Sequence, residues 1–209
     1  MAISTYSELI TELERWLDRA DDLALSNALP NIITLAEAWL NKVLRVRDME
    51  NREHQSISTE YMTLPSAAVA LRASWVTQNG VKYPLRVMTL EQMAFEDKGE
   101  TGRPVGMALL GENNEIRLFP APDTSYDTDI VYYERLTGLT ATQATNWLIT
   151  DHPDIYLFAC LRLASLFSRD QEGVSFWEGE ANRAILALRE SDEEDKQSGG
   201  SLVATVAIS

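Results

Sequence analysis

Apolar residues recur with helical spacing in two segments near the start of the chain. Thr5 and Glu8 stand three residues apart in the pattern of a capping box, in which a hydroxyl and a carboxylate satisfy free amides at a helix start. The apolar positions that follow predict a first helix that ends near Arg19. A second helix, with Ser26 as its N-cap, carries a broad apolar face as far as Leu44, so we expect it to be buried along much of its length.

The periodicity changes from helical to alternating after Arg52. Short extended segments are separated by turn signals, and the Asn-Gly pair at 79–80 is a strong signal for a hairpin. Residues 111–114 separate a further pair of extended segments. Between these two turns, Thr89 and Gln92 repeat the capping-box pattern and predict a short helix. The middle of the chain is therefore predicted to be a small antiparallel β region.

Helical periodicity returns near Pro153, a residue that suits the first turn of a helix. Residues 155–167 are apolar nearly all round, which is typical of a helix at the centre of a bundle. Arg162 interrupts that apolar surface, and a cation there needs a partner. We expect an ion pair with an acid of the last helix, Glu178 or Glu180, and keep contact with a neighbouring subunit as the alternative.

The last predicted helix spans about 173–195 and carries Trp177 on its apolar face. We expect Trp177 to pack with Trp39 of the second helix and Leu161 of the third as the core of the bundle. Because truncation of large core residues is costly, replacement of either tryptophan by alanine would then destabilise the fold.

The final residues combine a flexible joint with an apolar, strand-prone segment. The joint is Ser-Gly-Gly-Ser at 198–201, a composition that lets the following residues swing away from the body. We expect that following segment to dock as a strand on another chain, with pairing to the chain's own β region as the alternative. Its residues are Leu202, Val203, Ala204, Thr205, Val206, Ala207 and Ile208.

These elements together predict an α+β protein. Two N-terminal and two C-terminal helices form a four-helix bundle, a central antiparallel β insertion interrupts it, and an extended C-terminal tail follows. The expected divisions are 1–52 and 146–197 for the bundle, 53–145 for the insertion and 198–209 for the joint and docking strand.

Composition narrows the range of partners. The 209 residues contain 32 acids and 18 bases, a formal charge of −14, and such a charge disfavours binding to phosphate backbones or anionic lipids. No apolar run is long enough to span a bilayer, and the first residues do not resemble a signal peptide. The single cysteine, Cys160, fits a reducing compartment.

The sequence offers no catalytic or metal-binding constellation. The two histidines, His54 and His152, are far apart, and one cysteine cannot build a thiolate zinc site. His152 and Cys160 would lie about 12 Å apart along a helix, too far for a direct hydrogen bond. We therefore expect no enzyme activity, no metal and no cofactor.

Three stretches occur in an order that resembles the phage head-to-tail adaptor, or connector, proteins. They are residues 118–123, Leu-Phe-Pro-Ala-Pro-Asp; residues 131–136, Val-Tyr-Tyr-Glu-Arg-Leu; and Asn-Trp-Leu-Ile at 146–149, which leads into His-Pro-Asp-Ile-Tyr-Leu at 152–157. The resemblance covers roughly residues 5–195, including the order of two helices, a β region and two helices.

This resemblance implies a structural role in the virion. Such proteins form a ring, expected to hold twelve copies, below the portal protein, where they extend the DNA channel and present a surface to tail or nozzle proteins. DNA would pass without specific binding, no membrane would be involved, and assembly would take place in the host cytoplasm before the protein resides in the neck.

Two other classes of function stay open at this point. One is an acidic inhibitor that mimics DNA, for which the scattered charge and long apolar helices are unfavourable. The other is a small α+β hydrolase or ligand-binding domain, which would need a deep polar pocket with convergent carboxylates.

Overall fold

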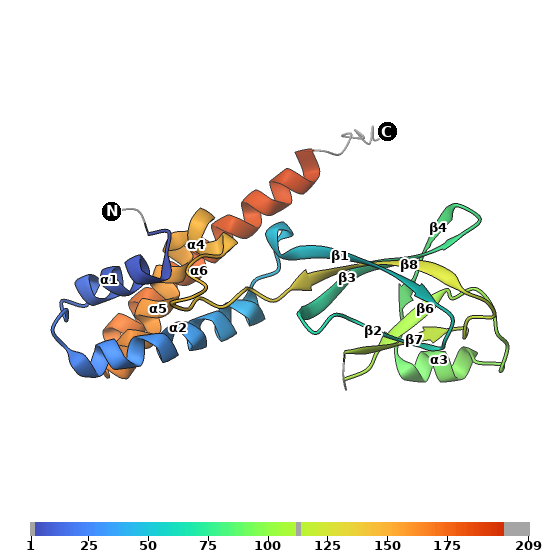
Figure 1. The fold of residues 1–209 in the computed structure, drawn as a ribbon, viewed down its shortest axis with the longest axis horizontal. Helices are drawn as coiled ribbons and strands as arrows, with labels where there is room; N and C mark the ends of the chain where they lie inside the picture. The colour runs from blue at the N-terminus through green and yellow to red at the C-terminus, as the bar shows by residue number, and fades with distance from the viewer. Residues whose placement is uncertain (1–2, 112–113, 199–209) are drawn as a thin grey trace, which may run out of the picture. The chain divides into compact units, whose positions relative to one another are not determined.

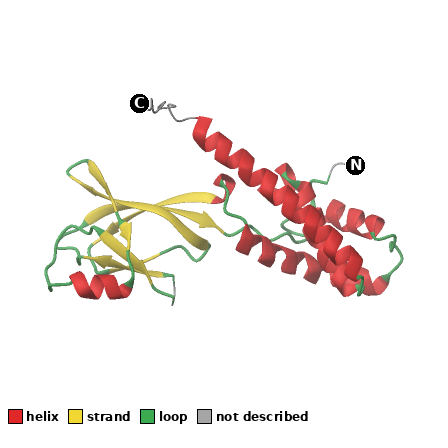
Figure 2. Cartoon of the chain, turned by 180° about the vertical axis from the view of Figure 1, so that it is seen from behind, coloured by secondary structure: helices red, strands yellow, loops and turns green. Residues whose placement is uncertain are grey.

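The computed structural model describes residues 3–111 and 114–198, and the side chains up to residue 194. The chain divides into two compact units (Figure 1). The helical unit contains the residues up to Asp48 and those from Leu136 onward, and the β unit is Met49–Arg135. The described residues form six α-helices and two sheets, so the α+β class is as predicted. Figure 2 shows the strands gathered in one of the two units.

The helical unit is organised around one apolar helix. Helix α5 packs against each of the unit's other helices, and its buried residues include Ile155, Tyr156 and Leu161, which confirms the prediction of a central helix over 155–167. The bounds of these helices are α1 (Tyr6–Trp16), α2 (Leu23–Val43), α4 (Trp147–Asp151), α5 (Pro153–Phe167) and α6 (Gln171–Ser198). The four-helix bundle of two N-terminal and two C-terminal helices stays a prediction.

Helix α2 begins four residues earlier than its sequence suggested. Asp22, not Ser26, is the N-cap, since its carboxylate accepts hydrogen bonds from the amides of Ala24 and Leu25 at 2.9 and 3.2 Å. The hydroxyl of Ser26 donates instead to the carboxylate of Glu14 in α1. A carboxylate at the N-cap also suits the positive end of the helix dipole, so the earlier start is favoured.

The β unit consists of two four-stranded sheets that share one apolar core. The sheet orders are β1-β8-β3-β4 and β2-β7-β6-β5. The core cluster joins Ile130 and Tyr132 of the first sheet to Ile116 and Leu118 of the second. The strands are β1 (Glu50–Ile57), β2 (Tyr61–Thr63), β3 (Ala68–Gln78), β4 (Val81–Pro84), β5 (Arg86–Val87), β6 (Gly106–Leu109), β7 (Glu115–Phe119) and β8 (Tyr126–Glu134), with a short 3-10 helix at Arg47–Met49.

Turn chemistry accounts for much of this topology. The predicted hairpin is confirmed, because Asn79 and Gly80, both with positive φ, connect β3 to β4. The predicted short helix is α3 (Leu90–Glu96), with the Thr89 capping box complete. The prediction of an antiparallel region is wrong for one pair of strands, because β5 and β6 pair in parallel. Parallel strands need a long crossover, and α3 with its loop supplies it.

The first and last strands of the β unit are paired along eight residues. Glu50 of β1 stands opposite Tyr133 of β8, and the register continues without a break to Ile57 opposite Tyr126. The chain enters the β unit through β1 and leaves it through β8. The two ends of the insertion are therefore held side by side within the β unit itself.

Buried polar contacts fasten the segment that follows β8 to the helices. Two groups donate to one oxygen of Glu37 at 2.6 Å each: the hydroxyl of Tyr156 and the amide of Leu139. One turn later on α2, the Asn41 side chain accepts from the amide of Leu136 at 2.8 Å. Burial raises the pKa of Glu37, so the hydrogen bonds only partly offset the loss of hydration. Residues 136–139 are thus tied to α2 and α5.

Tyr156→Phe removes the hydroxyl that donates to Glu37 and leaves a buried carboxylate with one donor fewer. We expect a loss of about 1–2 kcal/mol in the free energy of unfolding, since an unsatisfied buried acceptor costs about this much. Chemical denaturation measures it. Tyr6→Phe, at a half-buried tyrosine on α1, is the matched control. An unchanged midpoint for Tyr156→Phe would contradict the role given to this bond.

Candidate interaction surfaces

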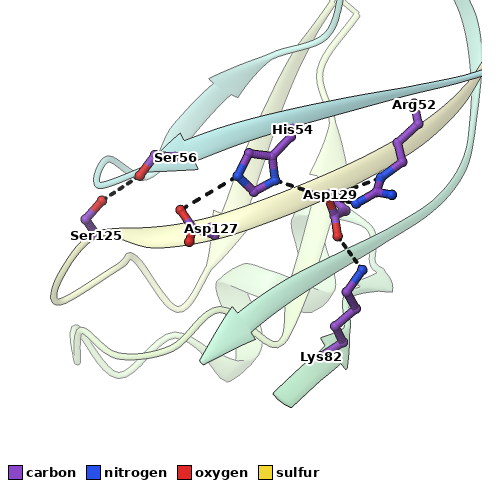
Figure 3. A network of polar contacts seen from close by, with 7 residues as sticks. All are labelled: Arg52, His54, Ser56, Lys82, Ser125, Asp127 and Asp129. Carbon is purple, nitrogen blue, oxygen red and sulfur yellow. Dashed lines mark hydrogen bonds and ion pairs between the residues drawn. The ribbon is translucent and has the colours of Figure 1, made fainter. Parts of the chain in front are cut away.

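A buried carboxylate lies on the outer face of the first sheet of the β unit. Asp129 of β8 is surrounded by three basic side chains from two other strands (Figure 3). Arg52 donates from Nη2 to its Oδ1 at 2.6 Å, His54 Nδ1 lies 3.1 Å from the same oxygen, and Lys82 donates to Oδ2 at 2.7 Å. The Asp129 side chain is 4% exposed, whereas its basic partners are more than half exposed.

Strand register explains how these residues meet. His54 stands directly opposite Asp129, and Arg52 is two residues along the same face of β1. Lys82 reaches Asp129 from β4 across the intervening strand β3. The hydrogen bonds from Lys82 and then Arg52 hold the pKa of Asp129 well below its usual range, because they favour the charged carboxylate. Both oxygens are engaged, so this group stabilises the sheet and has no free position for a substrate.

A partly exposed cluster of four aromatic rings lies on the helical unit. Trp177 at the start of α6 contacts Trp16 at the end of α1, with ring centroids 5.5 Å apart, and stacks on Phe158 of α5 at 5.8 Å. Phe176 meets the Trp177 ring edge-on at 4.7 Å. Trp16 is 49% and Phe176 57% exposed. We call Trp16, Phe158, Phe176 and Trp177 the aromatic cluster.

The expectation that Trp39, Leu161 and Trp177 form one buried core is wrong. Leu161 is fully buried, but both tryptophans are only half-buried, and the buried positions of α6 are instead Ala181 and Ile185. These residues come one and two turns after Trp177, where α6 runs along α5. Trp177 therefore belongs to the aromatic cluster at the surface.

Arg162 pairs within its own chain, as expected. Its Nη1 lies 3.5 Å from Glu178 Oε1, and its guanidinium carbon lies 4.8 Å from the centroid of the Trp39 ring. The Trp39 ring thus helps to shelter the cation that interrupts α5, a cation–π contact on top of the ion pair.

A groove lies between α1 and the segment that precedes α4. Its volume is about 410 Å³. The segment is held against the helix by a 2.8 Å hydrogen bond from the Tyr6 amide to the Ala144 carbonyl. The lining residues carry no charge and are Tyr6, Ser7, Ile10, Thr11, Ala141 and Ala144. We call this feature the α1 groove.

Comparison with known families gives an assignment over nearly the whole chain. The family model described as SU10 adaptor protein matches residues 4–205, which span both units. The chain belongs to this family. The resemblance to phage head-to-tail adaptors is thereby confirmed, and the family is one of structural phage proteins, not of enzymes. No curated protein matches the chain.

The described residues of this SU10 adaptor give no support for metal or thiol chemistry. Burial raises the pKa of Cys160, which is fully buried and stays a thiol, and His152 precedes α5 as its N-cap residue. Within the described part of the chain, no three His, Cys, Asp or Glu side chains are placed to hold a metal ion, and no helix is long and apolar enough to cross a bilayer.

The structure describes surfaces that the sequence did not single out. The predicted docking strand, 202–208, lies outside the described residues. The aromatic cluster was missed because helical periodicity marks Trp177 as apolar but does not tell a core position from an interface position. The signals that could have found it are the adjacent aromatic pair Phe176 and Trp177, in the second turn of α6, and Trp16 as the last residue of α1.

Asp129→Asn should lower the free energy of unfolding at pH 7 by about 1–3 kcal/mol, because charge-assisted hydrogen bonds from three partners are weakened. A carboxyl with a depressed folded-state pKa stabilises the protein above its unfolded pKa of about 3.9 and loses that contribution as the pH falls further. The variant should therefore lose less stability than the parent between about pH 5 and pH 2.

Urea unfolding across this pH range tests the prediction. Asp127→Asn is the matched control, because Asp127 is on the same strand, its side chain is 60% exposed, and its Oδ1 lies 3.9 Å from Nε2 of His54. Equal effects of the two substitutions would show that Asp129 has no special role.

Proposed function

We propose that this adaptor forms a ring of twelve copies below the portal protein, joins the phage head to the tail, and extends the DNA channel. The observation that carries the proposal is the family match across both units. The described surfaces support it: the charged groups of the Asp129 network are paired internally, whereas the aromatic cluster and the α1 groove are accessible to another protein. The paired helices of the helical unit act as a four-helix bundle in the ring wall.

The acidic composition fits a channel through which DNA passes. Twelve copies at −14 each carry 12 × −14 = −168 formal charges. Such a field repels phosphates, so DNA moves through the ring without adhering to it. The same charge opposes closure of a free ring, and the portal serves as the template on which the subunits gather. The neck of the virion is therefore the site of action.

The free protein should sediment at moderate salt as a species near its monomer mass of 23.5 kDa, and mixing with the portal of the same phage should yield twelve-fold rings bound to it. Analytical ultracentrifugation and electron-microscopic class averages measure the two states. A stable free dodecamer at micromolar concentration would contradict the template role. No binding to the portal would contradict the function itself.

The apolar segment 202–208 is proposed to dock as a strand on the portal or on an adjacent subunit. The segment is rich in β-branched and apolar residues, whereas solvated tails are usually polar, and strand addition would satisfy its backbone groups. The described part of α6 packs against α5 through Ala181 and Ile185.

A chain that ends at Gln197 should keep the thermal midpoint of the parent but no longer join portal rings in a pull-down. Val203→Asp combined with Val206→Asp is the matched full-length control, since it keeps the length and removes only the apolar, strand-forming character. It should behave like the truncation. Loss of stability with portal binding intact would show that the segment is part of the protein's own core.

A further inference from the structure

The first sheet of the β unit ends in an open strand edge at β1. The sheet order places β1 at one side, where it pairs with β8 alone, over eight residues and without a bulge. Glu50–Ile57 also contains no proline, so neither of these usual interruptions breaks the edge. The side chains of Arg52, His54 and Ser56 reach across the sheet to residues of β8 and of the turn before it, and they turn away from the edge (Figure 3).

The pairing pattern shows which backbone groups of β1 face outward. The Ser74 carbonyl in β3 accepts from the Leu85 amide on the β4 side at 3.0 Å, so the backbone groups of Ser74 point away from β8. Its partner Ile130 in β8 then points towards β1, where Glu53 stands opposite it. Because backbone groups alternate along a strand, the residues of β1 that face outward are 50, 52, 54 and 56.

A side-chain contact agrees with this assignment. The Arg52 amide donates to the side-chain oxygen of Asn51 at 2.8 Å, as an amide outside the pairing with β8 is free to do. The amides of His54 and Ser56, and the carbonyls of these residues and of Arg52, have no hydrogen-bond partner in the described part of the chain. Strand edges with free donors and acceptors are the sites at which extended segments add to a sheet.

The other edge strands of the β unit are shorter than β1. They are β4 with four residues, β2 with three and β5 with two. The last residue of β4 is Pro84, which has no amide hydrogen to donate. Among the described strands, β1 therefore offers the edge along which a longer segment can pair.

The segment 202–208 fits this edge in length and in character. Its seven residues compare with the eight of β1, and it has neither proline nor glycine. Valine, threonine and isoleucine make up four of the seven, and these β-branched residues are enriched in strands. The segment carries no charged side chain, so it brings no like charge to an edge strand that contains both acids and bases.

The presence of one such edge and one such segment on every chain favours an adjacent copy as the partner. A segment that pairs with the edge of the next copy makes a head-to-tail contact, and such contacts close into a ring when the rotation permits. Two β1 edges that paired with each other would instead form a two-fold dimer, with no edge left for a further copy. Pairing within one chain would fill the edge without joining copies.

We propose that residues 202–208 of one copy add as a fifth strand to the outer edge of β1 in an adjacent copy, and that this contact links the copies around the ring. The inference rests on the proposed ring, and it gives the docking segment a named acceptor. The amides of His54 and Ser56 donate to the added strand, and the carbonyls of the outward residues accept from it.

Hydrogen exchange in the full-length chain tests whether the edge is occupied. The amides of His54 and Ser56 should exchange at least about ten-fold more slowly in portal-bound rings than in the dilute free protein, because each gains an acceptor. The amides of Glu53 and Gln55 face β8 in both states and are the internal control. Equal rates for His54 and Ser56 in the two states would overturn the proposal, whether the edge is empty in both or filled by the chain's own segment.

A photo-cross-link identifies the occupant. Ser209→Cys places a thiol one residue after the docking segment, which stays unchanged, and Cys160 is fully buried and does not react. After labelling with a benzophenone maleimide and assembly on the portal, irradiation should join two copies, with the bond at β1 or at a residue next to it. Cross-links to the portal, within one chain, or elsewhere on the neighbouring copy would each overturn the proposal.

The outcomes for the contact and for the proposed function are separate. In each result above the chain has joined the portal, so the function stands. Failure to bind the portal counts against the function itself. The contact is then judged in the free protein at high concentration in 1 M salt, which shortens the screening length to about 3 Å and suppresses repulsion between copies. Absence of cross-links at β1 between copies under those conditions would overturn the inference as well.

Ser56→Pro, with Ser56→Ala as its matched control, completes the test. Both remove the hydroxyl contact with Ser125 at 2.8 Å, but only proline removes the outward amide hydrogen. Proline is tolerated on an edge strand where the amide faces outward, so both variants should keep the thermal midpoint of the parent.

Ser56→Pro should raise the concentration for half-maximal ring assembly on the portal about ten-fold or more, because a backbone hydrogen bond to the added strand is lost. Ser56→Ala should leave that concentration unchanged. Equal effects of the two substitutions would contradict strand addition at this edge. If Ser56→Pro melts at a lower temperature, the exchange and cross-linking results decide.

Discussion

Pairing between the first and last strands of the β unit is the constraint on which the rest of this molecule depends. Because β1 and β8 are neighbours over eight residues, a unit of 87 residues, Met49–Arg135, is inserted between α2 and the later helices with both its ends close together. Insertions with adjacent ends leave the host fold intact. The helical unit can therefore be completed by α5 and α6 although they follow the insertion in sequence.

Two buried carboxylates stabilise this arrangement in contrasting ways. Asp129 joins β8 to β1 and β4 through basic partners, which lower its pKa and favour the charge. Glu37 holds the segment after β8 through neutral donors, and burial raises its pKa because those donors do not replace all the lost hydration. Asp129 thus holds β8 within its sheet, and Glu37 holds the segment that follows β8.

The features that the sequence predicted are those determined by neighbours along the chain. The turn at Asn79 and Gly80, the capping box at Thr89 and the all-round apolar surface of α5 each follow from a few consecutive residues. The Arg162–Glu178 pair was found because a cation on an apolar helix needs a partner on the helix packed against it.

The features that were missed depend on contacts between distant residues. Asp129 meets residues 77 and 47 positions away, a match set by strand register that no local pattern reveals. The parallel β5–β6 pair and the surface position of Trp177 likewise depend on packing. The four-helix bundle stays a prediction, as does the docking of residues 202–208 as a strand on another chain.

The central claim is that the helical unit is complete without the inserted β unit. The most direct test replaces Met49–Arg135 by a short Gly-Ser linker and follows helical circular dichroism during thermal unfolding. The account predicts a folded helical protein with one cooperative transition, because β1 and β8 only bring the ends of the insertion together. An unfolded chain, or a gradual loss of signal without a transition, would contradict it.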